Sequence, residues 1–95
     1  MITQEGDRLL VQGPVTIGTV SALLAEARVL LVQGVAVLDF EAVTEVDSAA
    51  VALALECLRE ARERGLKLSL TNLPEAMQNL AELYAVSELL RAAPA

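Results

Sequence analysis

The sequence predicts a small α/β fold, in which a mixed sheet carries helices mainly on one face. The first observation is the nearly continuous apolar and β-branched run 35–40, which is typical of a strand covered on both faces. The second is the turn-like pair Gly6-Asp7 between runs 2–5 and 8–12, which predicts a hairpin at the sheet edge. The third is helical spacing between the later strands, because helical crossovers favour parallel neighbours.

The first helix is predicted after Gly13-Pro14, which breaks the second strand. Thr16 or Thr19 is its candidate cap, and Gly34 ends it near residue 32. Its apolar residues recur at helical spacing and are Val20, Leu23, Leu24, Ala27, Leu30 and Leu31. The helix therefore has one continuous side to place against a sheet.

The second helix follows a short polar loop after the central strand, with Asp47 and Ser48 as good capping residues. Gly65 lies where the residue after a helix end is expected, and the strand 66–71 comes next. A third helix starts at 72–74 with an apolar stripe made of Ala76, Met77, Leu80, Leu83 and Tyr84. Leu89 and Leu90 are expected in a last turn that packs beneath it.

Length and charge limit the classes of function. Ninety-five residues make one domain, 1–95, of which 91–95 is expected to be a loose tail. A net charge of −6 and an aromatic content of 2% argue against a nucleic-acid partner. The chain shows no signal-peptide pattern and no apolar run of the roughly 18 to 20 residues that span a membrane. We therefore expect a cytoplasmic protein without direct membrane insertion.

The residue types also weigh against catalysis and metal binding. With no histidine and one cysteine, the usual zinc sites and Ser-His-Asp triads cannot be assembled from this chain. Cys57 falls inside the second helix and is interpreted as an inert core thiol. Four nearby acids lack the glycine-containing spacing of a calcium loop and are interpreted as solvated: Asp39, Glu41, Glu45 and Asp47. No metal, cofactor or enzymatic activity is predicted.

The start of the second helix is the candidate site, because residues 49–55 are all apolar before the first charge, Glu56. A helical wheel places one set of residues toward the core: Ala50, Ala54, Cys57, Leu58 and Ala61. It places another set on a separate face: Ser48, Ala52, Leu55 and Arg59. Two interpretations stay open: the apolar turns are wholly buried, or they form a flat docking surface for a partner. The small, uncharged side chains at the helix start favour the docking surface.

Several segments resemble the STAS family, the fold of bacterial anti-sigma factor antagonists and of sulfate-transporter C-terminal domains. They are the strand Val37-Leu38-Asp39-Phe40, the loop and helix start 46–53, the turn 64–68, and the ending Leu80-Ala81-Glu82-Leu83-Tyr84, which is similar to that of MlaB-type members. The resemblance covers nearly the whole chain. It implies a STAS-like mixed sheet with a hairpin edge and with parallel strands joined by helices.

Within the family, two functions compete. Antagonists carry Asp-Ser-Ser-Gly, in which the second serine accepts phosphate, whereas this chain has Asp47-Ser48-Ala49-Ala50. The MlaB-type motif is Asp-Thr-Gly-Gly, which places a hydroxyl at the position of Ser48. The MlaB resemblance implies a cytoplasmic subunit, peripheral to the inner membrane, that binds the ATPase of a phospholipid-transporting ABC system and helps to maintain outer-membrane lipid asymmetry.

The resulting hypothesis is a non-enzymatic regulator that docks on an ABC ATPase. The chain has no GxxxxGK[ST] loop, so ATP chemistry would belong to the partner. The expected partner-binding residues are Thr44, Glu45, Val46, Asp47, Ser48, Ala49, Val51, Ala52 and Leu55. The alternative is an anti-sigma factor antagonist that acts on a kinase-like partner, with Ser48 as the candidate phosphoacceptor. The sequence does not decide the cargo, the partner's identity, or whether the chain forms homo-oligomers.

Overall fold

The computed structural model describes residues 1–91. The predicted loose tail, 91–95, therefore lies outside the described residues except for Arg91, which ends a short helix. In chain order the elements are β1 (Ile2–Glu5), β2 (Arg8–Val11), β3 (Gly13–Val15), α1 (Val20–Leu30), β4 (Val37–Asp39), β5 (Val43–Val46), α2 (Ser48–Glu63), β6 (Ser69–Thr71), α3 (Glu75–Leu83) and α4 (Ser87–Arg91).

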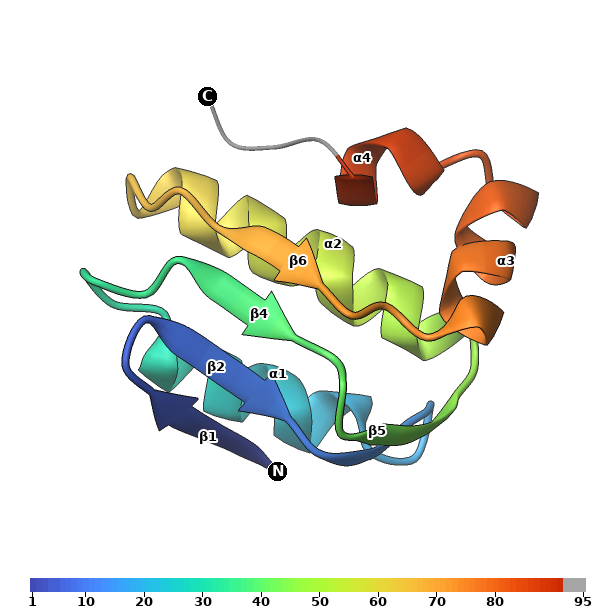
Figure 1. Ribbon diagram of the computed structural model, residues 1–95, viewed down its shortest axis with the longest axis horizontal. Helices are drawn as coiled ribbons and strands as arrows, with labels where there is room; N and C mark the ends of the chain where they lie inside the picture. Colours follow the sequence, from blue (N-terminus) through green and yellow to red (C-terminus); the bar gives the residue numbers. More distant parts are fainter. Residues whose placement is uncertain (92–95) are drawn as a thin grey trace.

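The predicted mixed sheet is confirmed, with the strand order β1-β2-β4-β6 (Figure 1). β1 and β2 form the antiparallel edge hairpin, turned at Gly6, whose φ of 61° lies in the left-handed region that glycine adopts freely. β2 pairs with β4 and β4 with β6, both in parallel. Parallel pairing of β4 and β6 requires the crossover that α2 supplies.

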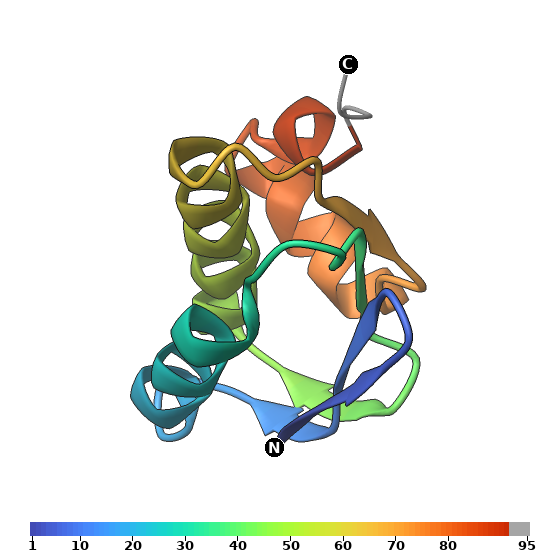
Figure 2. The same ribbon diagram turned by 90° about the vertical axis from the view of Figure 1, so that its left-hand side faces the viewer.

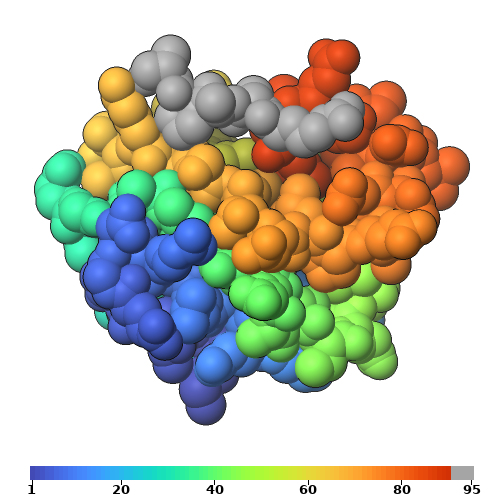
Figure 3. Space-filling view, in the orientation of Figure 1, coloured from blue at the N-terminus to red at the C-terminus, as the bar shows by residue number. Residues whose placement is uncertain are grey.

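Helices α1 and α2 lie side by side in one layer beside the sheet (Figure 2). Between the layers, alternate strand residues such as Leu9, Val11 and Leu38 are fully buried against the inner helix faces. On the helix side, α2 contributes Ala50, Ala54, Cys57 and Ala61, as the wheel predicted. Among residues 1–91, no helix covers the opposite face, where the strands are visible in the space-filling view (Figure 3).

A second, two-stranded sheet was not predicted. β3 and β5 pair in parallel, although the sequence suggested a break at Gly13-Pro14 and a polar loop before α2. The pairing is irregular, because the register shifts between Gly13 and Pro14. It is nevertheless anchored at its end, where Val15 is fully buried and its carbonyl accepts a bond from the Asp47 amide at 3.3 Å. The segment that leads into α2 is therefore held in place by strand pairing.

The predicted stripe of α3 is only partly correct. Met77 is fully buried and Leu80 is half-buried, whereas Ala76, Leu83 and Tyr84 are exposed. The helix spans only nine residues, and the buried side is completed by Ala81 rather than by its C-terminal turn. The predicted last turn is present as α4, where Leu90 is buried but Leu89 faces solvent.

Candidate partner-binding surface

The start of α2 is fixed by the carboxylate of Asp47. Its Oδ1 accepts a hydrogen bond from the Ala49 amide at 2.8 Å, which satisfies one of the free donors of the first helical turn. Its Oδ2 accepts a second bond, from the Ile17 amide at 3.0 Å. Asp47 therefore acts as a structural cap that also ties the loop before α1 to the start of α2.

That loop is ordered by Thr19. Its Oγ1 accepts from the Thr16 amide and donates to the Pro14 carbonyl, both at 2.9 Å. Thr19 precedes α1, as predicted, but its side chain bonds the loop instead of the helix amides. The loop leaves the Ile17 side chain 80% exposed beside the start of α2. Ile17 was missed because only the tertiary bond to Asp47 brings its loop to this surface.

The predicted site residues differ in exposure. Thr44, Glu45, Ser48 and Ala52 are exposed, while Val46, Asp47 and Leu55 are half-buried. The prediction needs correction at Ala49 and Val51, which are only 8% and 4% exposed because α2 turns both side chains into the protein. We define the α2 entry surface as the exposed residues Ile17, Thr44, Glu45, Ser48 and Ala52 together with the half-buried Leu55. Its role in binding a partner stays a prediction.

The second half of α2 has the opposite character, because ion pairs cover it. Arg28 of α1 pairs with Glu60 at 3.1 Å and with Glu56 at 3.6 Å. Along α2 itself, Arg59 pairs with Glu56 and Glu63. The hydrogen bond from Arg59 lowers the pKa of the Glu56 carboxyl, burial opposes this shift, and the charges of Arg59 and Arg28 lower the pKa further.

The Cys57 thiol lies at the centre of the core. It is fully buried, and burial raises its pKa to about 12, with smaller effects from Glu56 and Glu60 in the same direction. A thiol with this pKa is almost entirely protonated at neutral pH and is a poor nucleophile. The position of Cys57 accords with its interpretation as a core residue.

Asp39 is the one buried charged residue within the described chain, at 6% exposure. Its carboxylate accepts from Arg8 at 2.9 Å, from Asn72 Nδ2 at 3.0 Å and from the Glu41 amide at 2.9 Å. Burial raises the pKa of this carboxyl, but the bonds from Asn72 and Glu41 and the charge of Arg8 outweigh that effect, so the pKa is lowered. Asp39 thus joins β2, β4 and the end of β6.

No group of three or more acidic or cysteine side chains in residues 1–91 is placed to hold a metal ion. The interpretation of the four acids as solvated is wrong for Asp39, which is buried, and the fold separates the four. Asp39 bonds within the sheet and Asp47 caps α2, whereas the Glu41 and Glu45 side chains face solvent. Within the same range, no helix has both the length and the apolar character required to cross a membrane.

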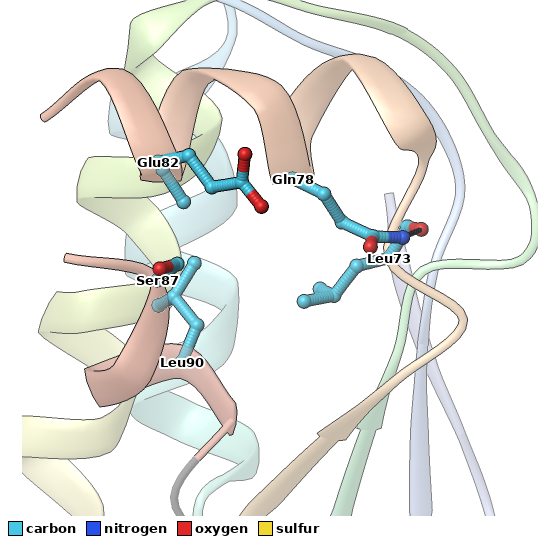
Figure 4. A pocket seen from close by; sticks show the side chains of 6 residues that line it. Leu73, Gln78, Glu82, Ser87 and Leu90 are labelled. Carbon is cyan, nitrogen blue, oxygen red and sulfur yellow. Dashed lines mark hydrogen bonds between the residues drawn. The ribbon is translucent and has the colours of Figure 1, made fainter. Parts of the chain in front are cut away.

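Two depressions lie near α3. The first, between α3 and α4, is lined by Leu73, Gln78, Ala81, Glu82, Ser87 and Leu90 (Figure 4). The second runs along β5, encloses about 370 Å³ of open space, and is lined by Val43, Thr44, Glu45, Val46, Pro74 and Ala76. We call the second depression the β5 groove. It shares Thr44 and Glu45 with the α2 entry surface, so the two features form one continuous face.

Comparison with known proteins supports the fold and the family. The family model described as "Mlab, STAS domain" matches residues 1–91. Among solved structures, the unphosphorylated anti-sigma factor antagonist SpoIIAA is 20% identical with a TM-score of 0.63, over 87% of this chain and 81% of that one. The phosphorylated SpoIIAA of Bacillus is 18% identical with a TM-score of 0.64, over 90% and 83%.

A sulfate transporter family protein from Wolinella succinogenes is 17% identical with a TM-score of 0.65, and the match covers 88% of this chain and 70% of that protein. At these identities the likeness concerns the fold alone. Among curated proteins, none matches this chain significantly.

Proposed function

Because this chain belongs to the STAS domain family, with a match to its MlaB-type model over residues 1–91, we propose that it is a non-enzymatic subunit that binds the ATPase of an ABC-type phospholipid transport system. It would act in the cytoplasm, held at the inner membrane through that partner. The observation that carries the proposal is the uncharged start of α2, which exposes Ser48 and Ala52 and which Asp47 holds in a fixed position.

The α2 entry surface has the composition of a docking face. Ser48 and Ala52 are small and exposed, so a partner backbone or helix can approach α2 closely. Leu55 and Ile17 add apolar area on either side, and Ile17 is unusually exposed for its type. Because α2 and the Ile17 loop are already bonded to each other, little conformational entropy is lost when a partner binds.

The absence of a phosphate-binding loop from the sequence fits a division of labour with the partner. The chain has no GxxxxGK[ST] motif that would hold the phosphates of ATP. At the start of α2, the carboxylate of Asp47 already accepts a hydrogen bond from the Ala49 amide. The proposed contribution of this chain is to bind the ATPase and to stabilise or regulate it, while ATP is bound and hydrolysed by the partner.

Binding to the purified ATPase subunit, measured by titration calorimetry, tests the proposal. We expect Ser48→Arg and Leu55→Glu each to weaken binding at least tenfold, because each places a charge on a surface that a partner must desolvate. Matched controls carry the same new side chains elsewhere: Gln33→Arg and Val29→Glu, both at exposed positions near the end of α1. Unchanged affinity for both site variants, with folding verified by circular dichroism, would exclude this face.

A second candidate, phosphorylation-controlled binding to an anti-sigma factor kinase, is favoured by the exposure of Ser48 as the first residue of α2. Phosphate there would be stabilised by the helix dipole. The position that accepts phosphate in the Asp-Ser-Ser-Gly motif is Ala49 here, and it is buried. Intact-mass measurement after incubation with such a kinase should show a single phosphate that Ser48→Ala abolishes. A mass without phosphate removes this candidate.

A further inference from the structure

We propose that the β5 groove receives an apolar side chain from a segment of the partner protein that carries Lys or Arg on both sides of that residue. This inference rests on the proposed function, because it specifies the chemistry of the partner at the same face. Three features of the structure support it: the shape and lining of the groove, the acids around it, and the location of the cations.

The groove is apolar at its floor and open to solvent. Val43 and Val46 of β5 line one side, and Pro74 and Ala76 line the other at the start of α3. Among the described strands, β5 pairs only with β3, so the side of β5 facing α3 carries no neighbouring strand. The groove is a shared depression of open space, about 370 Å³ including adjoining solvent, and its mainly aliphatic lining suits an apolar side chain that projects from a partner.

One acidic residue lines this groove, and two more lie next to its lining segments in the sequence. Glu45 lines it directly, Glu75 lies between the lining residues Pro74 and Ala76, and Glu41 precedes β5 by two residues. All three side chains are exposed, and no hydrogen bond or ion pair of the described chain is assigned to their carboxylates. The unpaired carboxylate of Glu45 in the groove, with Glu75 and Glu41 in the segments that adjoin it, favours a cationic neighbour.

The basic residues of the protein lie in other segments of the chain than those that form the groove. The sequence has no Lys or Arg in 9–27, 29–58 or 68–90, which together hold β3, β5, the start of α2 and α3. The basic side chains that the structure describes are Arg8, Arg28, Arg59, Arg62, Arg64 and Lys67. Of these, four are held in ion pairs with Asp39, Glu56, Glu60 or Glu63. The protein itself thus supplies no counter-charge at the groove.

An anionic partner segment fits this face poorly. It would meet Glu45 and Glu75 without a compensating cation, and like charges brought together at an interface are repulsive. The start of α2 does not offset this repulsion, because Asp47 already accepts the amide hydrogens of Ala49 and Ile17. A partner segment with an apolar side chain between basic residues satisfies both the groove floor and its rim.

A pair of short peptides provides a direct probe. One carries a Leu-Leu centre flanked by two lysines on each side, and the other has glutamate at every lysine position. Two-dimensional 1H–15N NMR spectra of the full chain at low salt should shift for residues 43–46 and 75–77 with the lysine peptide, and stay unchanged with the glutamate peptide. Shifts scattered over all acidic surfaces, or equal effects of both peptides, would overturn the inference.

Two matched double variants distinguish the effect of charge at the groove from the effect of the protein's net charge. Glu45→Lys/Glu75→Lys should weaken binding of the lysine peptide by on the order of tenfold at low salt. Glu5→Lys/Glu88→Lys makes the same change in net charge at two exposed residues outside the groove, and its effect should be smaller than twofold. Equal losses in the two double variants would show that only net charge matters and would overturn the inference.

The same variants, titrated with the ATPase subunit, distinguish this inference from the proposed function. If the ATPase binds the unmodified chain and Leu55→Glu abolishes binding, but Glu45→Lys/Glu75→Lys binds normally, the proposed function stands and the inference is wrong. If the ATPase does not bind the unmodified chain, the proposed function fails, and the peptide spectra still decide the chemistry of the groove. A tenfold loss with Glu45→Lys/Glu75→Lys supports both.

Discussion

The two halves of α2 are held in place by different kinds of contact. The C-terminal half is joined to α1 through Arg28, Glu56 and Glu60, and Arg64 Nη1 donates to the carbonyls of Arg28 and Leu31 at 2.6 and 2.9 Å. The N-terminal half has no such bridges and exposes Ser48 and Ala52. Ion pairs therefore connect the C-terminal half to α1, whereas the N-terminal half carries no charged side chain and is the part that we propose a partner binds.

This difference shows how a small domain can keep a binding face rigid without covering it. The first turn of α2 is held by backbone bonds to Asp47, which point along the helix axis and leave its side free. The last turns are held by side chains that cross to α1 and bury part of their own length. The C-terminal end of α2 therefore provides stabilising contacts with α1, whereas the side of its N-terminal end stays accessible.

The largest effect is expected for Asp47→Ala, which removes both bonds that fix the binding half. Loss of the cap costs about 1–2 kcal/mol and loss of the Ile17 bond about 1 kcal/mol, so the free energy of unfolding should fall by roughly 2–3 kcal/mol. Asp47→Asn keeps one acceptor oxygen and should cost less than half as much. Urea titration measures both, and equal losses would contradict the two-bond arrangement.

An intermediate effect is expected for Arg64→Ala, which removes contacts between the C-terminal end of α2 and α1. The guanidinium satisfies two carbonyls at the end of α1 and is partly exposed, so we expect a loss of about 1–2 kcal/mol in the free energy of unfolding. The matched control is Arg62→Ala, an exposed residue of the same turn, with an expected change below about 0.5 kcal/mol. Binding at the α2 entry surface should be unchanged in both variants, because separate contacts hold the two halves of α2 in place.

The smallest effect is a pH dependence of the free energy of unfolding that arises from Glu56 in the C-terminal half of α2. The folded pKa of Glu56 is lowered, first by the bond from Arg59, so its stabilising contribution is present above the unfolded pKa of about 4.3 and is lost as pH falls through the folded value. Glu56→Gln should therefore be less stable than the unmodified protein at pH 6, and the difference should shrink as the pH falls below the unfolded pKa of about 4.3. Asp39 titrates in both proteins and cancels in the comparison. A constant difference between pH 6 and pH 3 would contradict this assignment.

Local signals explain why much of the fold was predictable. Gly6 marks the hairpin, and Gly65 ends α2 with a φ of 72°, where the Leu66 amide bonds the Ala61 carbonyl. The end of α3 uses the same bond pattern at Ala85, whose φ of 57° is strained for a residue with a Cβ atom. Because alanine is a strong helix former and gives no signal of a turn, the outward direction of Leu83 and Tyr84 was missed.

The candidate site was predictable at Asp47 and Ser48, since a capping residue before an apolar helix is a local pattern. Ile17 and the β5 groove were not, because each depends on contacts between segments distant in sequence. Ile17 reaches the site through a bond to a residue 30 positions away, and the groove forms where β5 meets the start of α3. β3 and β5 are also too short for alternation to reveal them, with three and four residues.

By itself, the sequence determined the order of the helices and of the main-sheet strands, the parallel crossovers and most of the buried face of α2, because periodicity and capping act within a few residues of the chain. Only the tertiary structure decided which apolar residues stay exposed and how charge is divided between the two ends of α2. Burial depends on what packs opposite a side chain, and that neighbour is set by the pairing of distant strands and by the α1–α2 contact. Ala49 and Ala52, three residues apart on one helix, show the difference: one is buried and the other faces solvent.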